Sequence, residues 1–120
     1  MKLKFLSDEF TVCKVKDLKE ISLDQPYYFI GRTDEEISII CPSKFTPSKV
    51  IDLESGWKLF KIEGVLDFKE IGIMAKISAL LAREQISVLV VSTYNTDYFL
   101  IKKENEEKTK TILIENGYEI

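Results

Sequence analysis

The chain has 120 residues, of which 45% are hydrophobic and 31% charged, and its formal net charge is −3. This length suffices for one well-formed core or for two small units that share a core. The negative charge disfavours nucleic acid as a partner, because proteins that neutralise phosphates carry clustered lysine and arginine. Histidine is absent, which excludes the usual zinc sites and a Ser-His-Asp triad. No stretch has the length and apolar character of a signal peptide, an anchor or a membrane span, so we expect a cytoplasmic protein without membrane contact.

The first half of the chain predicts strands but no full helix. Phe10–Val15 is expected to be a strand, and residues 30–40 a hairpin. Between them, Asp17–Pro26 is expected to be a shortened crossover. Pro42 should end the second hairpin strand, and Thr46–Pro47 should open one short helical turn with the proline at its first position.

The second half begins with a predicted strand, Trp57–Ile62, and an amphipathic helix whose apolar residues recur at spacings of three and four. Asp67 and Glu70 match the capping pattern, so we expect Asp67 to be the N-cap of a helix beginning at Phe68. The helix should end near Glu84–Gln85. Its apolar face consists of Ile73, Ile77, Leu80 and Leu81.

A hairpin and a second helix follow in the predicted order. Residues 86–93 and 98–102 are strand-like and are separated by turn-forming residues. Asn105 should cap the second helix and Asn116–Gly117 should end it, before a last short strand, Tyr118–Ile120. The predicted order is therefore β-α-β-β-α-β, the ferredoxin-like arrangement.

The two halves are similar to each other but unequal. Residues 30–40 align without gaps on residues 91–101, at an offset of 61, whereas the strands Phe10–Val15 and Trp57–Ile62 are offset by 47. The first repeat is thus 14 residues shorter where its first helix belongs. We expect an abbreviated unit at residues 1–55 and a complete unit at residues 56–120.

Two segments carry a resemblance to a known family. Residues 64–77 combine a strand end, a short acidic loop and a helix entered through Gly72, and residues 92–98 form a polar turn between strands. Together they resemble the ACT domain family, especially the small tandem ACT proteins related to aspartokinase regulatory regions and to cytosolic amino-acid sensors. The resemblance implies an α+β fold with tandem ferredoxin-like units, the first abbreviated, and antiparallel sheets with helices on one face.

The resemblance also implies a ligand site at the junction of two ACT domains. In the family, ligands that are mostly amino acids contact the loop after the first strand and the start of the first helix. The Gly72 and Ile73 amides could hold a carboxylate there, while the Asp67 carboxylate takes an ammonium group. Unlike the family's common compact Asp-Arg-Pro-Gly form, Asp67 and Gly72 stand five residues apart. The implied ligand contacts are Leu66, Asp67, Ile71, Gly72, Ile73, Thr93, Tyr94 and Asn95.

Each candidate also has a purely structural explanation. Asp67 would be only a cap, Gly72 would only permit close contact between helix and sheet, and Asn95 and Thr96 would form side-chain turns. The aromatic residues are expected in the core and interfaces rather than on a base-stacking surface. Cys13 and Cys41 lie in apolar runs without a neighbouring base, so catalysis is not expected.

The function that the resemblance implies is regulation by a bound small molecule, a free amino acid, without a cofactor, a metal or enzymatic activity. A homodimer or larger homo-oligomer is expected, because an abbreviated unit leaves sheet edges exposed. The regulated partner would be another protein or a second copy. Two alternatives stay open at this point: an oligomerisation or interaction module without a ligand, and a small enzyme of amino-acid metabolism.

Overall fold

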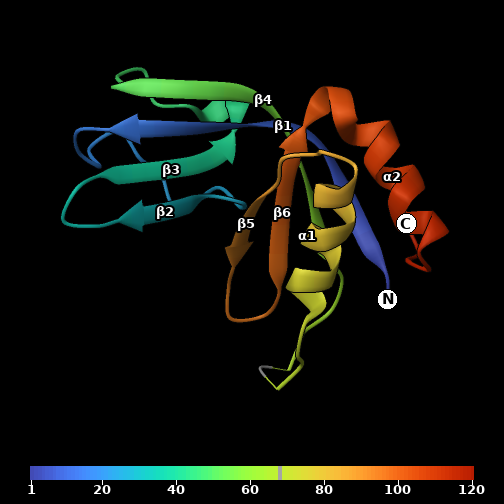
Figure 1. Cartoon of the computed structure of the whole chain (residues 1–120). Helices are drawn as coiled ribbons and strands as arrows, with labels where there is room; N and C mark the ends of the chain where they lie inside the picture. The colour runs from blue at the N-terminus through green and yellow to red at the C-terminus, as the bar shows by residue number, and fades with distance from the viewer. Residues whose placement is uncertain (68) are drawn as a thin grey trace. The chain divides into compact units, whose positions relative to one another are not determined.

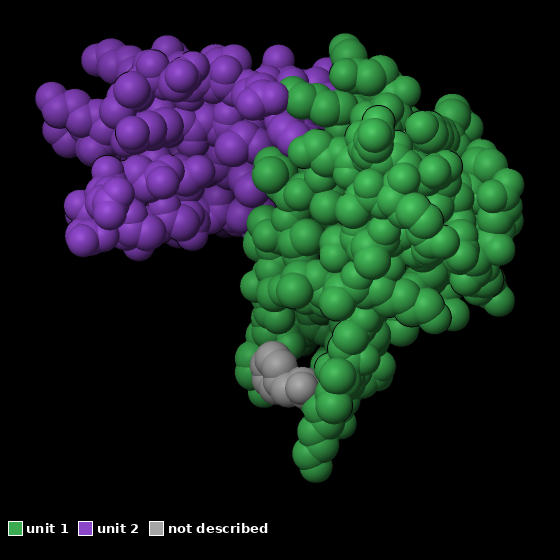
Figure 2. All heavy atoms as spheres, viewed as in Figure 1, with its two compact units in different colours: residues 1–7, 58–120 green, residues 8–57 purple. Residues whose placement is uncertain are grey.

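The computed structural model describes residues 1–67 and 69–120 (Figure 1). The chain forms two compact units, coloured separately in Figure 2. One consists of residues 8–57 and the other of residues 1–7 and 58–120. Two long strands, β1 (Leu3–Val15) and β4 (Asp52–Ile62), each contribute residues to both units. The expected boundary between residues 55 and 56 lies two positions before the boundary between residues 57 and 58 in the structure. Residues 1–7 belong to the C-terminal unit.

The C-terminal unit combines strands of one sheet with two helices. Its strands are ordered β1-β4-β6-β5, and β5 pairs antiparallel with β6 so that Leu89 faces Leu100 and Ser92 faces Asp97. The helices α1 and α2 contact each other. This arrangement confirms the predicted ferredoxin-like fold. The elements beyond β4 are α1 (Ile73–Arg83), β5 (Leu89–Ser92), β6 (Asp97–Lys102), the 3-10 turn η2 (Lys103–Asn105) and α2 (Glu106–Glu115).

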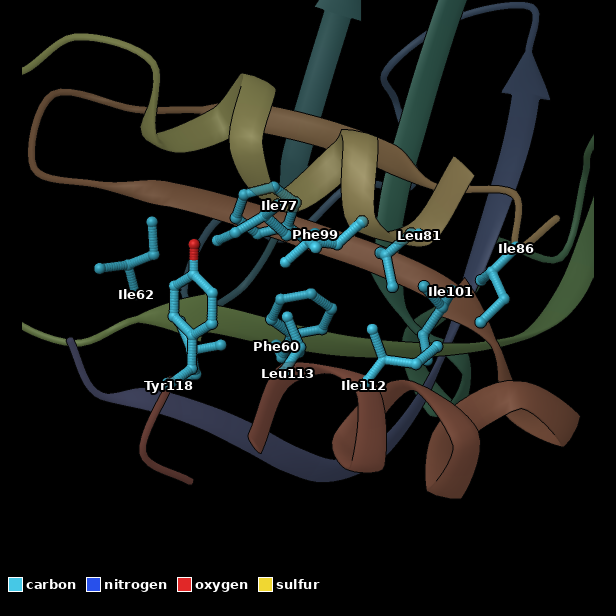
Figure 3. Close-up of a cluster of buried hydrophobic side chains, with 12 residues drawn as sticks. Phe60, Ile62, Ile77, Leu81, Ile86, Phe99, Ile101, Ile112, Leu113 and Tyr118 are labelled. Carbon is cyan, nitrogen blue, oxygen red and sulfur yellow. The ribbon is translucent and has the colours of Figure 1, made fainter. Parts of the chain in front are cut away.

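The core of this unit lies between its helices and its strands (Figure 3). Phe60 of β4 is fully buried and stacks on Phe99 of β6, with 4.9 Å between the ring centroids. Phe5 of β1 stacks on Phe60 at 4.8 Å. The apolar face of α1 packs here as its spacing predicts, through Ile77 and Leu81 among others. The first residues of the chain therefore belong to this core.

The helix ends agree with the sequence in three of four cases. The helix α1 ends at Arg83 with Glu84 as C-cap, as expected. For α2, the N-cap is Asn105 and the C-cap is Asn116. Gly117 follows with φ 92°, a left-handed conformation that glycine adopts without steric cost.

The predicted start of α1 was wrong. The helix begins at Ile73 and its N-cap is Gly72, with φ 77°. The Asp67 carboxylate instead accepts a hydrogen bond from the Lys69 amide at 2.8 Å. Asp67 thus forms a local side-chain turn, an alternative that aspartate commonly offers the backbone. The expected first helical residue, position 68, lies outside the described residues.

The last predicted strand is reduced to a single bridge. Lys2 and Glu119 form an isolated parallel bridge, with a hydrogen bond of 2.7 Å from the Leu3 amide to the Glu119 carbonyl. Beside β4 the unit has the start of β1, so the beginning of the chain takes the place expected for its end.

The N-terminal unit has strands in the order β2-β3-β1-β4. Its β2 is Phe29–Arg32 and its β3 is Ile37–Pro42, which ends at the proline as expected. The segment Asp17–Pro26 contains turns and no helix, which confirms the shortened crossover. The 3-10 turn η1 (Ser43–Phe45) precedes Thr46–Pro47, so the helical turn predicted to begin there was wrong.

The two hairpins match in register, but at an offset of 60 rather than the predicted 61. The strands β2 and β3 begin at residues 29 and 37, and β5 and β6 at residues 89 and 97. Both turns are closed by the same bond at 2.9 Å, from Thr33 N to the Glu36 carbonyl and from Thr93 N to the Thr96 carbonyl. These turn bonds fix the register of each hairpin. The predicted alignment of the two hairpins, which relied on hydrophobic character alone, was shifted by one residue. The ends of β1 and β4, Val15 and Ile62, agree with the predicted offset of 47.

Candidate functional site

The two segments singled out in the sequence meet in the C-terminal unit. The Leu66 amide, in the loop after β4, donates a hydrogen bond of 2.7 Å to the Asn95 carbonyl, in the turn between β5 and β6. The Thr96 hydroxyl, buried in the same turn, donates to the Ile62 carbonyl at the end of β4 at 2.9 Å. These two bonds hold the hairpin turn against the loop that leads into α1.

A cavity of about 330 Å³ lies between these loops and the start of α1. We call it the loop cavity. Its volume falls within the range of roughly 300–1,000 Å³ that is typical of small-molecule sites. Its described lining consists of Leu66, Asp67, Glu70, residues 72–75 and residues 92–97.

Seven of the eight candidate residues line this one cavity, and Ile71 does not. The Ile71 side chain is 94% exposed and borders a separate cavity with Met1 and Tyr118. The sequence therefore identified the segments that converge, but it did not predict that the Ile71 side chain would point away from the loop cavity.

Gly72 has a conformational role rather than a packing role. Its φ of 77° is left-handed, which disfavours residues with a Cβ. A Cβ built there would meet no described atom within 4 Å, so the alternative explanation, that Gly72 only permits close helix-to-sheet contact, was wrong. Because Gly72 is the N-cap, the amides of the first turn of α1 have no intrahelical acceptor and can bind an anion.

Carboxylates supply the charge of the described cavity lining. Asp67, Glu70 and Asp97 border the cavity, and no lysine or arginine is among its described lining residues. The Asp67 carboxylate accepts from the Lys69 amide, and the Asp97 carboxylate accepts from the Ser92 hydroxyl at 2.7 Å. The cavity therefore favours a ligand with an ammonium group, provided that any ligand carboxylate lies at the helix amides.

The turn residues combine structural bonds with exposure to the cavity. The Thr93 hydroxyl donates to the Thr96 carbonyl at 3.2 Å within its own turn, whereas the Thr96 hydroxyl, which the structural explanation assigned to a side-chain turn, bonds to Ile62 outside the turn. Tyr94 is 79% exposed and Met74, on α1, is 43% exposed. These two large side chains place apolar surface beside the polar part of the cavity.

Sequence reasoning missed six of the described lining residues: Glu70, Met74, Ala75, Ser92, Thr96 and Asp97. The capping pattern gave Glu70 a structural role in the prediction. Met74 and Ala75 line the cavity because α1 starts at Ile73 rather than at residue 68. The left-handed preference of Gly72 was the signal that could have located this start.

The described residues contain no group of three or more histidine, cysteine, aspartate or glutamate side chains placed to hold a metal ion. None of the helices formed by residues 1–67 and 69–120 has the length and apolar character needed to cross a membrane.

Comparison with known proteins identifies the family. A model of the ACT domain matches residues 52–115. The chain belongs to the ACT domain family. A crystal structure of a protein from Agobacterium tumefaciens is 30% identical to this ACT protein, with a TM-score of 0.85 and coverage of 98% of this chain and 90% of that one. No curated protein matches the sequence.

More distant structures share the fold of this ACT protein. A Vibrio cholerae protein of unknown function, described as a possible transport protein, is 20% identical with a TM-score of 0.72, over 95% of this chain and 88% of that one. The regulatory subunit of aspartate kinase from Thermus thermophilus is 12% identical with a TM-score of 0.64, over 92% and 93% of the two chains. At these identities the likeness concerns the fold alone.

Proposed function

We propose that this ACT protein is a regulatory, non-catalytic chain that binds a free amino acid in the loop cavity. The observation that carries the proposal is the bond between the Leu66 amide and the Asn95 carbonyl, which joins the two ligand-contacting segments of the family around one cavity. Family membership and the likeness of fold to an aspartate kinase regulatory subunit support a regulatory, amino-acid-sensing role in general.

The ends of an amino acid match the two kinds of polar group at the cavity. Its α-carboxylate would lie at the amides of Ile73 and Met74, in the first turn of α1, where the helix dipole favours negative charge. Its α-ammonium would lie at the Asp67 or Glu70 carboxylate, in a charge-assisted hydrogen bond. Leu66, Met74 and Tyr94 offer apolar surface for the side chain.

A second copy of the chain would complete the site at an interface between ACT domains. Tyr94 lines the cavity and is 79% exposed. Ile71 lies on the other loop, outside the cavity lining, and is 94% exposed. Exposed apolar groups gathered beside a pocket are typical of interaction sites. A ligand that contacts both copies would stabilise one relative orientation, which is how occupancy is passed to a partner.

The proposal is tested by a thermal-shift screen against the twenty amino acids, followed by calorimetry with Asp67→Asn. Asparagine keeps an oxygen that accepts from the Lys69 amide but lacks the charge, so we expect unchanged stability and affinity weaker by roughly 1.5–3 kcal/mol. Asp17→Asn is a matched control, because Asp17 is exposed and accepts from the Lys19 amide in the same kind of turn, in the other unit.

Unchanged affinity in Asp67→Asn would remove Asp67 from the site. No thermal shift with any amino acid would contradict the amino-acid role and favour the ligand-free oligomerisation module. Light scattering tests the interface separately. A stable monomer in the presence of the ligand would contradict the claim that a second copy completes the site, but it would not contradict ligand binding in the loop cavity.

A further inference from the structure

A second cavity of about 350 Å³ lies in the N-terminal unit, apart from the loop cavity. Its lining includes three lysines, Lys16, Lys19 and Lys49, and we call it the lysine cavity. The segment after β1 and the segment before β4 form it. The hairpin turn of the same unit, residues 33–36, is not part of its described lining, although the equivalent turn lines the loop cavity. The lysine cavity is therefore a different kind of site rather than a copy of the first.

The carboxylates beside these lysines are bound to the protein's own amides. Both oxygens of Glu20 accept from Ser48, at 2.8 Å from its amide and 2.9 Å from its hydroxyl. These bonds lower the pKa of Glu20, with a smaller contribution from the Lys49 charge. Asp17 accepts from the Lys19 amide at 3.1 Å. The Glu20 carboxylate thus connects the two segments that form the cavity, and each of the two carboxylates has one oxygen that accepts from a backbone amide.

The charge of the lining leaves an excess of one cation. Three ammonium groups stand against two carboxylates, Asp17 and Glu20, in the described lining. Lys16 and Lys19 take part in no ion pair with the described residues. A ligand that balances this site would carry one negative charge.

The remaining lining is apolar and anchored to the core of the unit. Ile21 and Val50 pack against the cluster formed by Cys13, Val15, Ile39 and Cys41. Ile51 is 61% exposed, and its amide donates to the Lys14 carbonyl of β1 at 2.7 Å. An exposed isoleucine beside a cavity leaves apolar surface in water. An aliphatic group bound there would remove this surface from water, which is favourable.

We propose that the lysine cavity binds a small aliphatic monocarboxylate, with its carboxylate at Lys16 and Lys19 and its hydrocarbon part against Ile21, Val50 and Ile51. The excess of a single positive charge favours a monoanion over a phosphate or a dicarboxylate. The apolar wall selects an acid with a hydrocarbon tail over a fully hydrated anion.

The test uses 4-methylpentanoate as the probe and nuclear magnetic resonance of the full-length, ¹⁵N-labelled chain. We expect saturable shifts at the amides of Lys19, Lys49 and Val50. The uncharged 4-methylpentanamide and inorganic phosphate should each cause smaller shifts, because one lacks the charge and the other the tail.

Variants separate the charge from the apolar wall. The double variant Lys16→Gln/Lys19→Gln should weaken the affinity for 4-methylpentanoate roughly 2- to 30-fold, the range for losing two exposed ion pairs. Lys44→Gln is the matched control, since Lys44 is an exposed lysine of the same unit that pairs with Asp8 instead. Ile51→Ser should weaken the binding of 4-methylpentanoate but not that of acetate.

The proposal is overturned if 4-methylpentanoate causes no saturable shift at these amides. It is also overturned if the amide or phosphate binds as well as the acid, or if the lysine double variant binds like the control. A protein that no longer binds its amino acid in the loop cavity should still bind the probe, so failure of one site is distinguishable from failure of the other.

Discussion

Replacing Gly72 tests both the backbone geometry and the use of the helix amides. Gly72 has φ 77° and ψ 5°, and a Cβ there would meet no described atom within 4 Å. The cost of a side chain is thus conformational rather than a clash, and amounts to roughly 1–2 kcal/mol for an ordinary L-residue. We expect Gly72→Val to lower the free energy of unfolding by about this amount. Gly72→Asn should cost much less, because asparagine tolerates the left-handed region and is a good N-cap.

The two variants are compared by urea unfolding followed by circular dichroism, and by calorimetry with the amino acid found in the thermal-shift screen. Gly64→Val is the matched control: Gly64 has φ 90°, open space around its Cβ position and no part in the described cavity lining. Valine at 72 should abolish binding in the folded protein, whereas valine at 64 should only destabilise. Equal destabilisation by Asn and Val at position 72 would refute the conformational argument, and full affinity in folded Gly72→Val would refute the role of the amides.

Three further outcomes concern Thr96 and Phe99, which are buried, and Tyr28, which is half-buried. Thr96→Val should lower the free energy of unfolding by about 1–3 kcal/mol, measured by urea unfolding, because it leaves the Ile62 carbonyl without its hydrogen bond; no change would mean that the turn is not held by this bond. Phe99→Ala should cost about 3–5 kcal/mol in the same assay, because it empties the stack with Phe60; a cost below 1 kcal/mol would contradict the core assignment. Burial raises the pKa of Tyr28 to about 12 from its ordinary value of 10.0, so its contribution to stability is complete below pH 10 and is lost as pH rises toward 12. Tyr28→Phe should flatten the stability profile over that interval, and an unchanged slope would contradict the burial effect.

The sequence predicted the elements of the C-terminal unit because their signals are local. Apolar spacing located α1, and Asn105 and Asn116–Gly117 located both ends of α2. The short crossover of the first unit also followed from counting residues. For the helices the information lies within one turn of the element concerned, whereas the crossover follows from a comparison of the two repeats.

The errors have two origins, local competition for one side chain and contacts between distant parts of the chain. The capping pattern at Asp67 is real in composition, but the carboxylate bonds to Lys69 in a turn instead. The bridge that joins Lys2 to Glu119 has no local signal, so the role of the first residues in the C-terminal unit could not be predicted. The lysine cavity likewise depends on the bond between Glu20 and Ser48, which are 28 residues apart.

The central claim is that the loop cavity binds a free amino acid, and a titration of the ¹⁵N-labelled chain followed by nuclear magnetic resonance tests it most directly. Each of the twenty amino acids is added to the full-length protein, and the backbone amide shifts are followed to saturation. The account predicts that at least one amino acid shifts the amides of Gly72, Ile73 and Asn95 together, on the two loops that border the cavity. If none of the twenty shifts these amides, or if saturable changes occur only elsewhere in the chain, the claim is contradicted.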